Sequence, residues 1–175
     1  MPIFGSVRRP KLDGWTREEE KRRDALSPEV LKRSGEIREE GQGPAAVKVL
    51  REQMALEPAD RLWPLLLGSQ MMSLRRYGQA IEAFEAAVTR DANEVRGYYG
   101  AGMACYKAAE YKQKYGAAAT GEVAPAGLTV ENLYQEALRH FRRAMELTPD
   151  KAERDELASA VAIVTRAVAR KRGRL

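Results

Sequence analysis

The chain has 175 residues, of which 44% are hydrophobic and 31% are charged, and it carries a net charge of +5. This length suits one domain with a core of its own. No apolar run approaches the roughly 20 residues of a membrane helix, and residues 1–26 lack the apolar stretch of a signal peptide. A single cysteine excludes a disulfide within the chain and fits a reducing compartment. We therefore expect a cytoplasmic protein without a membrane span.

The positive charge is concentrated at the two ends. Residues 1–26 hold seven basic and five acidic side chains, residues 166–175 hold five basic and no acidic ones, and residues 27–165 hold 18 basic and 20 acidic ones. A nearly neutral body does not favour an extended nucleic-acid-binding face. The basic end could still make weak, salt-sensitive contacts with a polyanion, and the candidates are Arg166, Arg170, Lys171, Arg172 and Arg174.

Residues 1–26 are predicted to be a basic tail followed by a short helix. Thr16 and Glu19 have the spacing of a capping box, which indicates a helix that begins near Arg17. Ile3 and Phe4 are apolar, so they are candidates to dock on the rest of the chain or on a partner.

Residues 27–60 predict the first of three helix–turn–helix units. Ser27 and Pro28 are typical of a helix start. Gly41 marks the turn between the two helices, and Pro58 follows the end of the second helix.

Residues 61–94 form the clearest copy of this unit, which has a period of 34 residues. Pro64 falls in the first turn of a helix, where the missing N–H of proline is tolerated. Gly68 on the first helix and Ala80 on the second are small, so the two helices are predicted to approach closely there. Phe84 fills the remaining space.

Residues 95–150 hold the third copy, which is interrupted. Tyr111 and Tyr134 occupy the same position of the repeat, so about 22 residues, 112–133, are inserted between the two helices. No helix breaker occurs between residue 107 and Gly116, and the first helix is therefore expected to continue through residues 107–119, two or three turns past the usual turn.

The rest of the insertion predicts a helical hairpin. Residues 120–128 are rich in Gly and Pro and indicate a loop, after which Thr129 is expected to cap the second helix. One interpretation is a tolerated elongation of a surface loop. The other is a contact site, including one for self-association into a homo-oligomer.

Residues 151–171 predict one amphipathic helix, and residues 172–175 a basic tail. A repeat array needs such a terminal helix to cover the exposed face of its last repeat. The predicted apolar side consists of Leu157, Ala158, Val161, Ala162, Val164 and Val168.

The 34-residue period, with Gly68, Tyr77, Ala80, Phe84 and Ala87 at its small and large positions, resembles the tetratricopeptide repeat (TPR) family. The resemblance implies an all-α fold: an α-solenoid of about three TPR helix–turn–helix repeats with a C-terminal capping helix and a helical-hairpin insertion in the third repeat. It also implies a non-catalytic adaptor or scaffold that binds a protein partner and assists complex assembly.

In this family the first helix of each repeat lines a concave groove. The resemblance places a partner-binding groove at Leu31, Leu62, Leu65, Ser69, Met72, Arg96, Tyr99, Met103, Tyr106 and Lys107. Such apolar and aromatic residues favour the binding of a partner's helix or apolar segment. Two alternatives are that the chain's own Ile3 and Phe4 fill the groove, and that the repeats pack on one another and leave it shallow.

One branch of the family clamps the carboxylate of an acidic C-terminal peptide with lysines, asparagines and an arginine. Here the corresponding positions hold Leu31, Gly35, Leu66, Arg96 and Gly100. Only Arg96 suits that role, and this disfavours a clamp of that kind.

The sequence offers no catalytic constellation, metal site or cofactor motif. His140 is the only histidine and Cys105 the only cysteine, so one chain cannot assemble a zinc site of the usual kind. The alternative function is that of a nucleic-acid- or ribosome-associated accessory protein that docks through its basic termini.

Overall fold

The computed structural model describes residues 43–116 and 123–173, and the regular elements in this part of the chain are all helices. The N-terminal tail, the first helix of the first repeat and Leu31 lie outside the described residues. The helices are α2 (Gly43–Leu56), α3 (Leu62–Ser73), α4 (Tyr77–Arg90), α5 (Val95–Tyr115), α6 (Val130–Leu147) and α7 (Lys151–Arg172).

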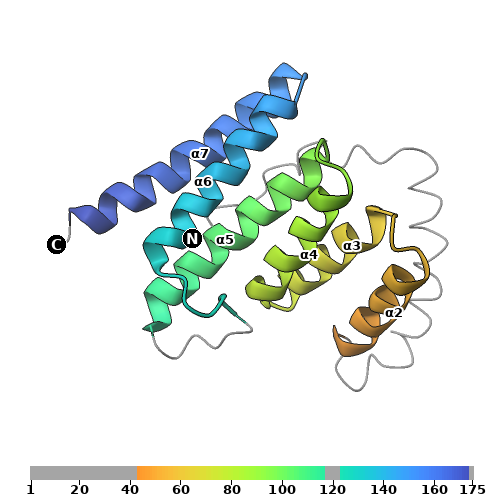
Figure 1. The fold of residues 1–175 in the computed structure, drawn as a ribbon. Coiled ribbons are helices and arrows are strands. Elements are labelled where there is room, and N and C mark those ends of the chain that lie inside the picture. Colours follow the sequence, from red (N-terminus) through yellow and green to blue (C-terminus); the bar gives the residue numbers. More distant parts are fainter. Residues whose placement is uncertain (1–42, 117–122, 174–175) are drawn as a thin grey trace.

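The helices pack side by side in chain order, from α2 at one end of the array to α7 at the other (Figure 1). Each helix contacts the one before it, and α3 also contacts α5. This is the arrangement of stacked helical hairpins, and it confirms the predicted all-α repeat fold.

The ring of Phe84 fills the centre of the array. A Cβ atom on Gly68 of α3 would lie 2.7 Å from this ring, and one on Gly100 of α5 would lie 2.5 Å from it. Both distances are far below van der Waals contact, so glycine is required on both sides of Phe84. The close approach predicted at Gly68 is therefore that of a helix to an aromatic ring. Gly102 has the same relation to Phe141 of α6, at 2.8 Å.

A buried carboxylate joins the starts of two repeats. Glu94 is the N-cap of α5 and is only 5% exposed. Its carboxylate accepts hydrogen bonds from the backbone N–H of Arg96 at 3.1 Å and from the Nε of Arg96 at 2.7 Å, and it forms an ion pair with the Nε of Arg61 at 2.8 Å. Because Arg61 directly precedes α3, this network ties the beginning of α3 to the beginning of α5.

The helix α5 is shorter than the sequence predicted. It ends at Tyr115, and Gly116 adopts a positive φ of 56°, a conformation that favours glycine and ends the helix. The predicted continuation over residues 117–119 lies outside the described residues. The N-cap of α6 is confirmed: Thr129 forms a capping box with Asn132.

The helix α7 packs against α6 at the end of the array (Figure 1). Leu157, Val164 and Val168 are buried, as predicted for its apolar side. Ala158 and Ala162 are exposed instead, because they lie at the edge of the apolar stripe, turned away from α6.

Candidate partner-binding groove

A cavity of about 1120 Å³ opens between the C-terminal halves of α5 and α7. The turn before α4 and the start of α6 complete its walls. We call this cavity the α5–α7 groove, and it is lined by Arg75, Tyr77, Tyr106, Lys107, Glu110, Tyr111, Gln113, Lys114, Tyr115, Tyr134, Ile163, Arg166, Ala167 and Arg170.

The length of α5 creates one wall of the groove. This helix has 21 residues, whereas α3 has 12 and α4 has 14. At a rise of about 1.5 Å per residue, the residues that follow Tyr111 extend the wall by one further turn. The Nζ of Lys112 donates to the carbonyl of Leu128 at 2.5 Å, which fixes this extension to the segment that leads into α6.

Two tyrosines form the inner wall and are held in place by hydrogen bonds. The rings of Tyr106 and Tyr134 have centroids 6.1 Å apart. The hydroxyl of Tyr106 donates to Glu110 at 2.7 Å, and that of Tyr134 donates to Gln113 at 2.9 Å. Burial raises the pKa of both tyrosines above the ordinary 10.0. Both hydroxyls are therefore neutral at physiological pH, and this wall contributes no negative charge.

Basic side chains outnumber acidic ones in the groove. Glu110 is the one acidic residue among the lining residues, and it is already engaged by the hydroxyl of Tyr106 and by the Nζ of Lys107 at 2.9 Å. The five basic lining residues are Arg75, Lys107, Lys114, Arg166 and Arg170. Within the part of the chain that the structure describes, all of these except Lys107 are without an ion pair.

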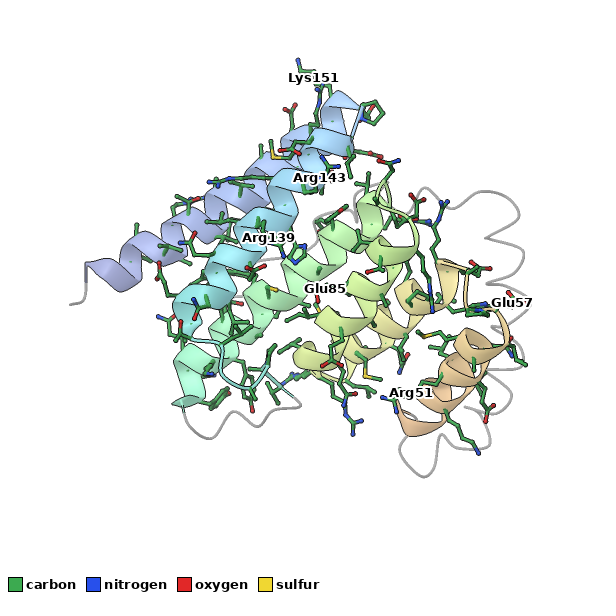
Figure 2. The ribbon with its side chains drawn as sticks, viewed as in Figure 1. Arg51, Glu57, Glu85, Arg139, Arg143 and Lys151 are labelled. Carbon is green, nitrogen blue, oxygen red and sulfur yellow. The ribbon has the colours of Figure 1, made fainter. Side chains whose placement is uncertain are left out.

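The outer face formed by α4 and α6 differs from the groove, because it carries basic side chains that form ion pairs. Figure 2 shows Arg139 and Arg143 on α6, with Glu85 on the neighbouring α4. Arg139 forms an ion pair with Glu136 at 2.6 Å, and Arg143 forms one with Glu146 at 2.9 Å. Both of these cations thus have an acidic neighbour on their own helix.

The one histidine is buried beneath this outer face. His140 is 2% exposed, and its Nε2 lies 3.6 Å from a carboxylate oxygen of Glu85. The interaction with the His140 imidazole lowers the pKa of Glu85 below its ordinary value of 4.5. Cys105 is also buried, and burial raises the pKa of its thiol to about 12. The thiolate is the reactive form of cysteine, so Cys105 is an inert core residue at physiological pH.

The structure brings together two sets of residues that the sequence predicted separately. Tyr106 and Lys107 were predicted to line the concave groove, whereas Arg166 and Arg170 were predicted to contact a polyanion. All four line the α5–α7 groove. The remaining polyanion candidates, Lys171, Arg172 and Arg174, have side chains outside the described part of the structure.

Part of the predicted concave groove is wrong. Leu62 and Leu65 were expected to face a partner, but they are 0% and 4% exposed. The reason is that α3 is packed by α2, α4 and α5 together, which leaves little of its circumference free.

Other predicted residues lie on the surface but outside the α5–α7 groove. Ser69 is exposed, and Met72 and Met103 are partly buried. Tyr99 packs on Phe141 with ring centroids 5.9 Å apart. The guanidinium of Arg96 is held by Glu94, as described above. These residues do not line the groove.

Sequence reasoning missed most of the groove wall on α5. The prediction stopped at Lys107, because an ordinary repeat helix ends near that point. Continuing the same helical spacing along the longer α5 gives Glu110 and Lys114, which do line the groove. The signal was therefore present in the predicted helix extension. Tyr77 and Tyr134 carried no such signal, because the sequence placed them at packing positions of the repeat.

The described residues also bear on metal binding and on membrane insertion. Among them, no group of three or more His, Cys, Asp or Glu side chains is placed to hold a metal ion. None of the described helices combines the length and the apolar character that crossing a membrane requires.

The fold is that of TPR domains. The first TPR of Spaghetti (RPAP3) bound to the HSP90 peptide SRMEEVD is similar at a TM-score of 0.55 and 16% identity, over 80% of this chain and 90% of that one. The type III secretion translocator chaperone SycD of Yersinia enterocolitica, in complex with a peptide of the translocator YopD, is similar at a TM-score of 0.53 and 21% identity, over 85% and 95%.

A third similar structure is the first TPR domain of human RPAP3, with a TM-score of 0.50 and 16% identity over 81% of this chain and 95% of that domain. No protein-family model and no curated protein matches the sequence. At these identities the similarity establishes the fold.

Proposed function

We propose that this chain is a non-catalytic adaptor that holds a partner protein and assists the assembly of a complex. The observation that carries the proposal is the α5–α7 groove, a large open cavity with tyrosine walls and five basic lining residues against one acidic one. Exposed surfaces that combine aromatic and basic side chains are typical of protein recognition sites. The peptide complexes of the similar TPR structures support the same role.

Site-specific photo-crosslinking in native cells tests this proposal. A photoreactive amino acid would replace Tyr115, which lines the groove and is 46% exposed. The control would carry the same amino acid in place of the exposed Glu82 of α4. We expect one dominant protein adduct from Tyr115 that is missing from the control. Identical adducts from both positions would contradict a partner site in the groove.

The second candidate function is a nucleic-acid- or ribosome-associated accessory role. The observation that favours it is that Arg166 and Arg170 lie in the groove without an ion pair among the described residues. Cations of this kind make salt-dependent phosphate contacts. This alternative predicts RNA adducts from Tyr115 in the same experiment, so the two functions give different products.

A further inference from the structure

Resting on the proposed function, we propose that the α5–α7 groove recognises an acidic amphipathic segment within a partner protein. Glutamate or aspartate side chains of that segment would pair with the basic residues on the two walls. Its apolar side chains would pack between those walls. The groove does not require a free C-terminus.

The cations lie on both walls of the groove. On α5 the cations are Lys114 and, seven residues before it, Lys107, which is already paired with Glu110. On α7, Arg166 and Arg170 are separated by roughly 6 Å along the helix. An elongated segment between α5 and α7 can therefore offer carboxylates to both walls. Such charge complementarity selects the sign of the partner and speeds its association.

Apolar groups lie between these cations. Ile163 and Ala167 of α7 are partly buried against the core, and both line the groove. They lie on the same face of α7 as Arg166 and Arg170. Tyr77 contributes a partly buried ring, and burial raises its pKa above the ordinary 10.0. Its neutral ring adds apolar surface. A segment with only acidic side chains would leave these surfaces exposed to water, which favours an amphipathic occupant.

The tyrosine rings do not suit nucleic-acid bases. Stacking requires an open ring face, but Tyr106 and Tyr134 are 3% and 1% exposed. Tyr111 and Tyr115 contact each other with centroids 4.4 Å apart, and the Nζ of Lys114 lies over the ring of Tyr115 at 5.0 Å. The two tyrosines of the inner wall are thus closed to bases, and the exposed Tyr115 is already in contact with Tyr111 and Lys114.

The shape of the groove suits a chain segment as its occupant. Its volume of about 1120 Å³ lies close to the upper end of the roughly 300–1000 Å³ of small-molecule pockets, and its lining residues extend along both α5 and α7. The cations are also spread over two helices rather than gathered at one point, as the binding of a single terminal carboxylate would require. An internal segment of a partner, with carboxylates along its length, can pair with cations on both helices.

Fluorescence anisotropy with blocked peptides tests the inference on the full chain. The probe is an acetylated and amidated peptide in which glutamate and leucine recur at helical spacing. The comparison peptides replace every glutamate by glutamine or by lysine, and a single-stranded RNA is measured alongside. The protein variants are R166E/R170E and a matched control, R142E/R154E, whose exposed arginines lie outside the groove. Circular dichroism confirms that both variants fold.

We expect the glutamate peptide to bind at least tenfold more tightly than the glutamine peptide. The reason is that several exposed ion pairs of modest strength together contribute about the free energy that corresponds to a tenfold change in affinity. R166E/R170E should lose about tenfold in affinity, and R142E/R154E less than twofold. Equal binding of the glutamate and glutamine peptides would overturn the inference but leave an apolar adaptor groove. Tighter binding of RNA than of every peptide would overturn the inference and the adaptor function together.

Discussion

The two halves of α5 have different surroundings. The first half is held by tight packing: Glu94 is bound by arginines at its start, and Gly100 and Gly102 lie against aromatic rings. The second half carries lysines and tyrosines along an open groove. One continuous helix thus joins a region that stabilises the fold to a region available to a partner. Substitutions in the first half should change the free energy of unfolding, and those in the second half should change binding.

The largest effect on stability is expected for Glu94→Gln. The substitution removes the negative charge that neutralises Arg61 and Arg96, and the loss of one partner from a largely buried ion pair is strongly destabilising. Because Arg61 is partly exposed, we expect a loss of about 2–3 kcal/mol in urea unfolding. Glu82→Gln on the exposed side of α4 is the matched control and should change stability by less than about 0.5 kcal/mol. Equal effects of the two variants would contradict the importance of the network.

Gly100→Ala should destabilise the chain by about 1–3 kcal/mol, because the added methyl group would overlap the ring of Phe84. Combining it with Phe84→Leu removes the overlap. The double variant should therefore be more stable than the sum of the two single losses predicts, as measured by a double-mutant cycle in urea. Strict additivity would show that the ring of Phe84 does not determine the glycine at this position.

A smaller effect is expected at the boundary between the two halves. Tyr106→Phe keeps the ring that packs on Tyr134 but removes the hydrogen bond to Glu110. The expected loss is about 1 kcal/mol of stability in urea unfolding. The affinity for an acidic peptide should change little, since the substitution removes no cation. A large loss of affinity at unchanged stability would assign the hydroxyl to the partner instead.

The smallest effect is expected on the outer face, at Glu85→Gln. The lowered pKa of Glu85 means that its ionised form stabilises the fold, and that this contribution is present above pH 4.5 and is lost as the pH falls through the folded-state pKa. Glu85 is about half exposed, so the contribution is small. In thermal unfolding the variant should be slightly less stable than wild type at pH 7 and equal to it in acid. A difference that grows in acid would contradict this pairing.

The sequence predicted the helical hairpin of residues 61–94 closely, because its signals are local. Gly68 and Phe84 allow the two helices to pack closely, and Pro64 marks the first turn of the first helix. The burial of Leu62 and Leu65 depends on the number of neighbours around α3, which a pattern within one repeat does not contain. The groove prediction failed there for that reason.

The candidate site was predicted only in fragments. Lys107 and Arg166 were both named, but in separate sets and for separate partners. Their meeting depends on the packing of α6 against both α5 and α7. This packing is a property of the assembled array. A reading of α5 as a longer wall would have joined the two sets.

The most direct test of the central claim is a map of the bound peptide on the protein by NMR. Uniformly ¹⁵N-labelled protein would be titrated with the blocked glutamate–leucine peptide, and amide shifts would be followed residue by residue. We predict that the largest shifts occur in residues 106–115 and 163–170, with small ones in residues 139–146 of the outer face. Shifts concentrated in α3 and the first half of α5, around Met72 and Tyr99, would contradict this prediction.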